Sequence, residues 1–191
     1  MFIAIMYAYG SDIESVGVDG IRGCLGIFLA TDTRLYAIHI PDAPNHFDAG
    51  RAAFVHYVNQ TEPNFNQGTA RLFAVMNGPN RPAAYAELLA YANDLGVHRL
   101  ETVRINEHLG QQGFGQDAAA IVCERIPGST NCRLKYTRGD DILWQNNGTA
   151  RADLYRANMQ ADDDRLSTNP ALGQGWHMVD DTNSTIATTN W

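Results

Sequence analysis

The sequence predicts a layered α+β fold, in which mixed or antiparallel β-sheets pack in a sandwich-like way and are flanked by two main helices. Several short apolar runs are separated by turn-forming residues, as strands are. Two longer segments, 46–60 and 81–95, carry apolar side chains at helical spacing. Apolar residues make up 45% and charged residues 18% of the 191-residue chain, which is enough to bury a globular core.

The first quarter of the chain predicts three strands. Residues 2–9 are apolar and are predicted to form a buried strand. Residues 10–22 are polar and contain glycines, so we expect a loop there. The apolar runs 24–30 and 34–40 flank Thr31-Asp32-Thr33, which predicts a hairpin.

Two helices and further strands follow. Asn45 is a suitable N-cap for the helix over 46–60, whose apolar stripe contains Phe47, Phe54 and Val58. Gly96 is a good terminator for the helix over 81–95. The remaining strands are predicted at residues 71–76, 99–105, 118–126, 132–137 and 142–145.

The C-terminal part of the chain differs in composition. It contains the acidic run Asp162-Asp163-Asp164 and many Asn, Thr and Ser residues. We therefore expect residues 1–149 to form one domain and residues 150–191 to form a loop-rich extension packed on it, with a short helix near 151–160.

Charge and composition exclude several classes of protein. The net charge of -7 disfavours binding to nucleic acid or to anionic membranes. No run approaches the roughly 18 apolar residues of a transmembrane helix. The histidines other than His39 lack metal-ligand spacing, so no metal or cofactor is expected. Three cysteines do not indicate a disulfide scaffold; Cys123 and Cys132 could pair, or could be small core residues.

The hairpin contains the candidate reactive residues, Cys24 and His39. A hairpin loop of two residues places them directly opposite each other, and a loop of four residues makes them diagonal neighbours on one face. A loop of three residues would put them on opposite faces. A neighbouring imidazolium lowers the pKa of a thiol, so the thiolate becomes available at neutral pH. The alternative is that Cys24 is a core residue and His39 a hydrogen-bonded strand residue.

A family resemblance favours the reactive interpretation. Gly23-Cys24 opens an apolar strand, a turn follows, and a second strand ends in His39-Ile40-Pro41. This pattern resembles the cysteine deamidases typified by the chemoreceptor glutamine deamidases, a superfamily that includes the catalytic domain of cytotoxic necrotizing factor and the Burkholderia lethal factor. The layout is similar over residues 15–145, but the motif match covers only the Cys and His segments.

The resemblance implies a role for each matching residue. Cys24 would be the nucleophile, His39 the general base and acid, and the backbone N–H groups of Gly23 and Cys24 the oxyanion site. In the chemoreceptor deamidases a threonine lies six residues before the cysteine; here that position is Val18. The third element therefore stays open among the Val18 carbonyl and the side chains of Ser15, Asp19 and Asn77.

The resemblance also implies a function. It predicts a hydrolase that deamidates glutamine or asparagine on a target protein, with a possible transglutaminase side activity, acting as a bacterial toxin or effector in virulence. A housekeeping deamidase of the chemoreceptor type and a non-catalytic binding or immunity module are the alternatives. The N-terminus lacks the features of a signal peptide, so the expected location is the bacterial cytoplasm or a target cell reached through a secretion system. The sequence does not determine the oligomeric state.

Overall fold

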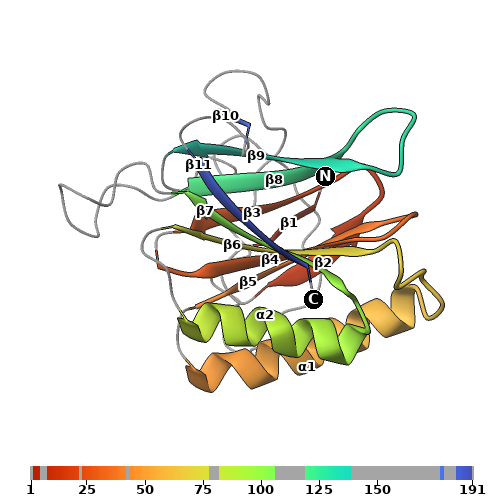
Figure 1. Ribbon diagram of the computed structural model, residues 1–191, viewed down its shortest axis with the longest axis horizontal. Coiled ribbons are helices and arrows are strands. Elements are labelled where there is room, and N and C mark those ends of the chain that lie inside the picture. The colour runs from red at the N-terminus through yellow and green to blue at the C-terminus, as the bar shows by residue number, and fades with distance from the viewer. Residues whose placement is uncertain are drawn as a thin grey trace.

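The described part of the protein forms three layers: a pair of helices, a six-stranded sheet and a five-stranded sheet (Figure 1). The computed structural model describes residues 2–4, 8–21, 23–41, 44–77, 82–105, 119–138, 177–178 and 184–190. Within these residues the architecture confirms the predicted α+β fold of mixed sheets flanked by two helices.

The six-stranded sheet is the middle layer, between the helices and the other sheet. Its strand order is β11-β7-β6-β4-β5-β2. β6 and β7 are parallel and the other neighbours are antiparallel. The bounds are β2 Tyr9–Asp12, β4 Leu25–Ala30, β5 Leu35–Ile40, β6 Arg71–Asn77, β7 Arg99–Ile105 and β11 Ser184–Asn190.

The five-stranded sheet forms an outer layer with the order β1-β3-β8-β9-β10. β1 pairs with β3 in parallel, and the other pairs are antiparallel. The bounds are β1 Phe2–Ala4, β3 Ser15–Ile21, β8 Ala119–Arg125, β9 Cys132–Arg138 and β10 His177–Met178.

Both helices, α1 Pro44–Thr61 and α2 Pro82–Leu95, cover the free face of the six-stranded sheet (Figure 1). Their apolar stripes are buried as predicted, because apolar residues three or four positions apart lie on one side of a helix. Neither of these two helices has the length and apolar character needed to cross a membrane.

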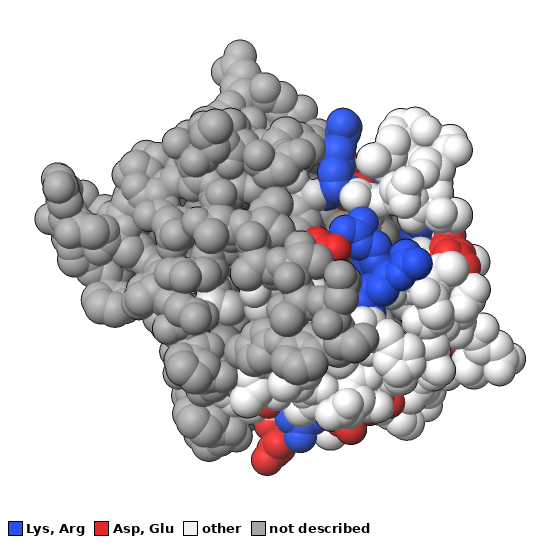
Figure 2. Space-filling model, in the orientation of Figure 1, with Lys and Arg blue, Asp and Glu red and all other residues white. Residues whose placement is uncertain are grey.

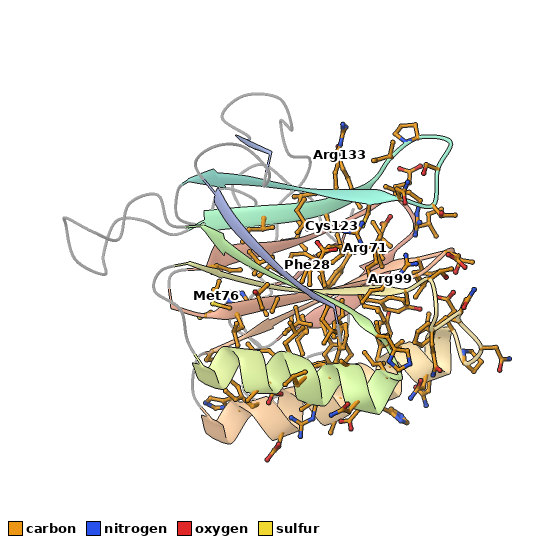
Figure 3. All side chains as sticks on the ribbon, in the orientation of Figure 1. Phe28, Arg71, Met76, Arg99, Cys123 and Arg133 are labelled. Carbon is orange, nitrogen blue, oxygen red and sulfur yellow. The ribbon has the colours of Figure 1, made fainter. Side chains whose placement is uncertain are left out.

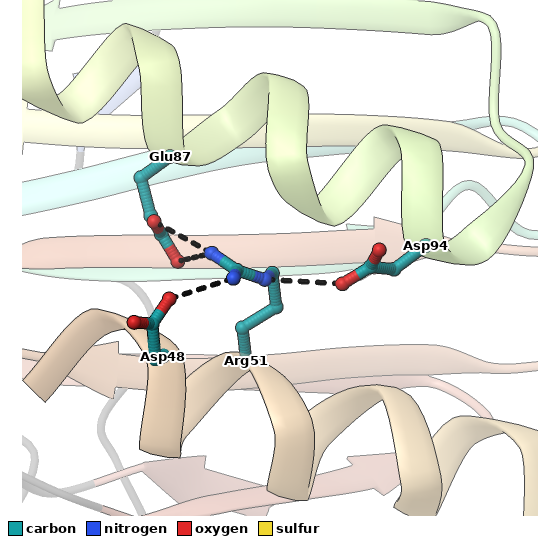
Figure 4. A network of polar contacts seen from close by, with 4 residues as sticks. All are labelled: Asp48, Arg51, Glu87 and Asp94. Atoms are coloured by element: carbon teal, nitrogen blue, oxygen red, sulfur yellow. Dashed lines mark hydrogen bonds and ion pairs between the residues drawn. The ribbon is translucent and has the colours of Figure 1, made fainter.

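Arg51 connects the two helices (Figure 4). From α1 it contacts both carboxylate oxygens of Glu87 in α2 at 2.9 Å, Asp94 in α2 at 3.0 Å and Asp48 in α1 at 2.7 Å. Burial raises the pKa of Glu87, and the Arg51 guanidinium opposes that rise. The network therefore keeps an otherwise costly buried carboxylate paired.

A second network fixes the turn between β4 and β5. Thr31 Oγ1 accepts a hydrogen bond from the Arg34 N–H at 3.0 Å. Glu62, just after α1, accepts hydrogen bonds from Thr31 at 2.8 Å, Thr33 at 2.5 Å and Tyr36 at 3.0 Å. These contacts between Glu62 and the turn thus stabilise a single register of the hairpin.

Several local predictions were wrong. Residues 10–22 are not a loop: they contain most of β2 and all of β3, whose Val16 and Val18 are buried between neighbouring strands. The predicted strand over 2–9 is two strands, because β1 and β2 belong to different sheets. β10 and β11 were not predicted, although they extend both sheets. The predicted strand at 142–145 and helix at 151–160 lie outside the described residues.

Candidate functional site

The register of the β4–β5 hairpin determines how Cys24 and His39 are related. Ala30 pairs with Leu35, so the loop contains four residues, 31–34. Gly26 lies directly opposite His39. Cys24 precedes β4 by one residue, and continuing the register makes it the diagonal neighbour of His39 on the same face.

That face is directed toward the five-stranded sheet. Phe28 and Ala37 lie on the same face of the hairpin as His39, and both belong to the core between the two sheets. A Cβ atom at Gly26 would lie 2.9 Å from Cδ1 of Ile21 and 3.5 Å from Cγ2 of Val18, both in β3. Gly26 therefore allows β3 to approach the hairpin beside His39.

His39 is buried with unsatisfied ring nitrogens. Its side chain is 1% exposed, and neither Nδ1 nor Nε2 has a hydrogen-bond partner in the described part of the chain. Its backbone N–H donates to the Ala8 carbonyl at 3.0 Å. Native proteins pair the large majority of buried polar side-chain atoms, so an unpaired imidazole in a packed core is unusual.

The protonation state of His39 corrects one expectation. Burial lowers its pKa from 6.5 to about 4, and the nearby Ala4 backbone opposes the shift without reaching hydrogen-bond geometry. The ring is therefore neutral at pH 7. The expectation of a resting imidazolium beside the thiol was wrong, because the inter-sheet core does not solvate a positive charge.

Cys24 lies at the edge of this buried region. It forms no disulfide and is half-buried, as is Gly23. Its sulfur makes no hydrogen bond to His39, since both ring nitrogens are without partners. Proton exchange between the two groups therefore requires a movement of the Cys24 side chain toward the ring.

The candidates for a third catalytic element, beside Cys24 and His39, lie in different parts of the fold. Val18 is fully buried beside Gly26, close to His39 in the fold. Ser15 begins β3 at the other end, opposite Glu124, and its N–H bonds to Asp12. Asn77 ends β6 in the register position next to Cys24, one residue beyond the Leu25–Met76 pair. Asp19 lies in β3, and its side chain is outside the described part of the structure.

Sequence reasoning did not identify three of the neighbours of His39. The backbones of Ala4 and Ala8 approach its ring and its N–H respectively. Nothing in the sequence indicates this, because every residue carries a carbonyl group. Gly26 did leave a signal, since a glycine within an apolar strand often marks a close approach of another segment.

Comparison with known proteins identified no family: no protein-family model matches the sequence, and no curated protein gives a significant match. Among the described residues, no group of three or more His, Cys, Asp and Glu side chains is arranged to hold a metal ion.

Proposed function

We propose that this protein is a cysteine-dependent amidohydrolase that deamidates glutamine, or asparagine, on a target protein, with Cys24 as nucleophile and His39 as general base and acid. The bacterial toxin or effector role implied by the family resemblance is part of the same proposal. One observation carries it: the four-residue loop gives the hairpin a register in which Cys24 and His39 are diagonal neighbours on one face.

The environment of His39 sets its part in the proposed reaction, because the lowered pKa makes the ring a weaker base and a stronger acid than a free imidazole. A neutral imidazole accepts a proton, and a ring with a pKa of about 4 releases that proton readily. Such a ring cannot stabilise a resting thiolate. We therefore expect the Cys24 proton to be transferred to His39 during attack rather than before substrate binds.

The reaction begins when Cys24 Sγ attacks the carboxamide carbon and its proton passes to His39. Backbone N–H groups at Gly23 and Cys24 stabilise the oxyanion of the tetrahedral intermediate. His39 then gives the proton to the departing amine, so ammonia leaves and a thioester remains on Cys24.

Water completes the cycle. His39 removes a proton from water, the hydroxide attacks the thioester carbon, and collapse of the second intermediate releases the carboxylic acid. His39 returns the proton to the sulfur. The net change is one amide and one water converted to one carboxylic acid and one ammonia. An amine in place of water gives transglutamination.

A second candidate, a non-catalytic binding module, is favoured by the burial of His39. With 1% of its side chain exposed, the His39 ring is enclosed by the core and does not meet an external substrate directly. In this alternative Cys24 and His39 are packing residues, and their replacement changes stability but no chemistry.

The deciding experiment measures ammonia release and deamidation by mass spectrometry. The protein is incubated with a glutamine peptide library and with cell extract. We expect Cys24→Ser and His39→Gln each to lower the rate by about a hundredfold or more. Cys132→Ser and His56→Gln are matched controls, since His56 is exposed on α1.

The variants separate the two candidates. Deamidation that persists unchanged in folded Cys24→Ser would exclude Cys24 as nucleophile. If wild type releases no ammonia from any library peptide or extract protein, the binding module is the better description. Circular dichroism of each variant distinguishes loss of chemistry from loss of fold.

A further inference from the structure

A second pair of cysteines lies away from the β4–β5 hairpin. Cys123 in β8 and Cys132 in β9 are diagonal neighbours, because Cys123 pairs with Leu134 and Cys132 with Arg125. Both thiols are free, Cys123 is fully buried and Cys132 is half-buried. Cys132 packs against the core cluster that contains Cys123, so both side chains lie on the same face of the β8–β9 pair.

The charges around the pair favour a thiolate at Cys132. The Cys123 hydrogen bond lowers the pKa of Cys132 most, and the guanidinium groups of Arg71 and Arg125 lower it further. Burial and the carboxylate of Glu101 act in the opposite direction. The same contact raises the pKa of Cys123, which therefore stays a thiol.

Arginines surround the approach to Cys132. Arg71 in β6 and Arg99 in β7 occupy opposite positions in the register of these neighbouring strands, and Arg71 also forms an ion pair with Glu101. Arg71 and Arg99, both labelled in Figure 3, line the same pocket as Cys132, and Figure 2 shows basic side chains gathered on this face of the molecule. A positive surface of this kind increases the local concentration of anions and stabilises negative charge on sulfur.

Cys132 is accessible to small molecules. It lines a pocket of about 120 Å³. Among the other lining residues are Arg71, Arg99, Asn131, Thr69 and Asp32. This volume admits a few water-sized molecules. Cys123 is fully buried and does not line this pocket, so an external reagent meets Cys132 first.

We propose that Cys132 and Cys123 form a second reactive site, a dithiol that hydroperoxides oxidise to a disulfide. The Cys132 thiolate attacks the nearer peroxide oxygen, the O–O bond breaks, and the sulfur becomes a sulfenic acid while hydroxide leaves. Cys123 then attacks the Cys132 sulfur, the S–O bond breaks, and the thiol proton leaves with hydroxide as water. The peroxide is reduced, the two sulfurs are oxidised, and an external dithiol restores them.

The test uses the full chain carrying Cys24→Ser, so that the result does not depend on the proposed deamidase site. Reduced protein is exposed to hydrogen peroxide at pH 7 and digested under acid conditions, and the peptides are identified by mass spectrometry. We expect a Cys123–Cys132 linked peptide to form at least about tenfold faster than a free cysteine peptide is oxidised. Dithiothreitol should remove it.

Two further variants test the order of events and the role of the charges. Cys123→Ser retains a hydroxyl donor but has no resolving thiol, so a sulfenic acid at Cys132 should accumulate and be trapped by dimedone. Arg71→Gln removes one of the two guanidinium groups that lower the pKa of Cys132 and leaves the opposing carboxylate of Glu101 in place, so we expect it to slow oxidation several-fold.

Three results would overturn the proposal. They are oxidation no faster than that of the free peptide, a sulfenic acid that persists in the presence of Cys123, and first oxidation at Cys123. A normal circular dichroism spectrum is required of each variant. If Cys123→Ser does not fold, the linked peptide in the Cys24→Ser protein still decides the question.

Discussion

The two cores of the protein differ in what they bury. The core between the six-stranded sheet and the helices is aromatic: Phe54 packs edge to face against Tyr36 and Tyr91, with ring centroids 6.4 and 5.7 Å apart. The core between the two sheets contains several alanines, along with Cys123 and, on the same face, His39. Each core is built on one face of the same β4–β5 hairpin.

This difference separates stability from chemistry. On the helix side, charged groups at the margin are paired, as Glu87 is with Arg51 and Glu62 with the hairpin turn. On the inter-sheet side, two titratable groups have pKa values moved in the direction that burial dictates. We infer that contacts on the helix side fix the hairpin register and that the proposed chemistry on the inter-sheet side depends on this register.

The largest expected effect is on the helix side. Phe54 is fully buried and contacts both Tyr36 and Tyr91. Phe54→Ala should lower the free energy of unfolding by about 3 to 5 kcal/mol, because it removes apolar contacts and leaves a cavity. Urea unfolding measures this. Replacement of the partly exposed Phe65 by Ala is the control, and equal losses in both variants would contradict the assignment of this core.

The next effect is the pH dependence caused by His39. Its folded pKa of about 4 lies below the ordinary 6.5, so the unfolded chain binds the extra proton in that window. The contribution is fully present above pH 6.5 and is lost as pH falls toward 4, a total of roughly 3 kcal/mol. His39→Gln should flatten this part of the stability curve.

Comparing His39→Gln with His56→Gln separates the effect of the buried His39 ring on stability from that of an exposed histidine. His56 is exposed, so this variant should retain the wild-type slope between pH 6.5 and 4. Urea unfolding at half-unit pH steps provides the measurement. If His39→Gln and His56→Gln give the same slope, the imidazole of His39 is not buried in the neutral form.

The smallest effect tests the close approach at Gly26. Gly26→Ala adds a methyl group 2.9 Å from Cδ1 of the buried Ile21. We expect a loss of about 1 to 3 kcal/mol from overpacking, and a lower rate of the proposed deamidation, because β3 must move away from the hairpin. Gly68→Ala is a mild control, since its nearest contact is the exposed Asn66 at 3.3 Å. An unchanged thermal midpoint in Gly26→Ala would show that the inter-sheet space is larger than described.

The structure also changes how thiol reactivity must be compared. Cys123 and Cys132 are the other cysteines against which alkylation of Cys24 can be compared. Cys132 is not a slow-reacting control, because hydrogen bonding and two guanidinium groups lower its pKa. The informative comparison is therefore alkylation of Cys24 in wild type against Cys24 in His39→Gln.

Local pattern predicted most of the regular elements. The helical stripes and the apolar runs gave α1, α2 and strands β4 to β9 within one or two residues, since side-chain periodicity is a local property. It failed for β3, where Gly17 and Gly20 suggested a loop. The strand forms there because β1 and β8 supply partners on both sides, and this is a non-local condition.

The sequence alone predicted the fold class and the hairpin, because both follow from local side-chain patterns. It left the hairpin loop length open, and the four-residue loop of the structure places Cys24 and His39 on a shared face. Only the tertiary structure decided that the face is enclosed by a second sheet, that His39 is neutral and that Cys123 meets Cys132. Those properties depend on which distant strands cover the hairpin and exclude water from it.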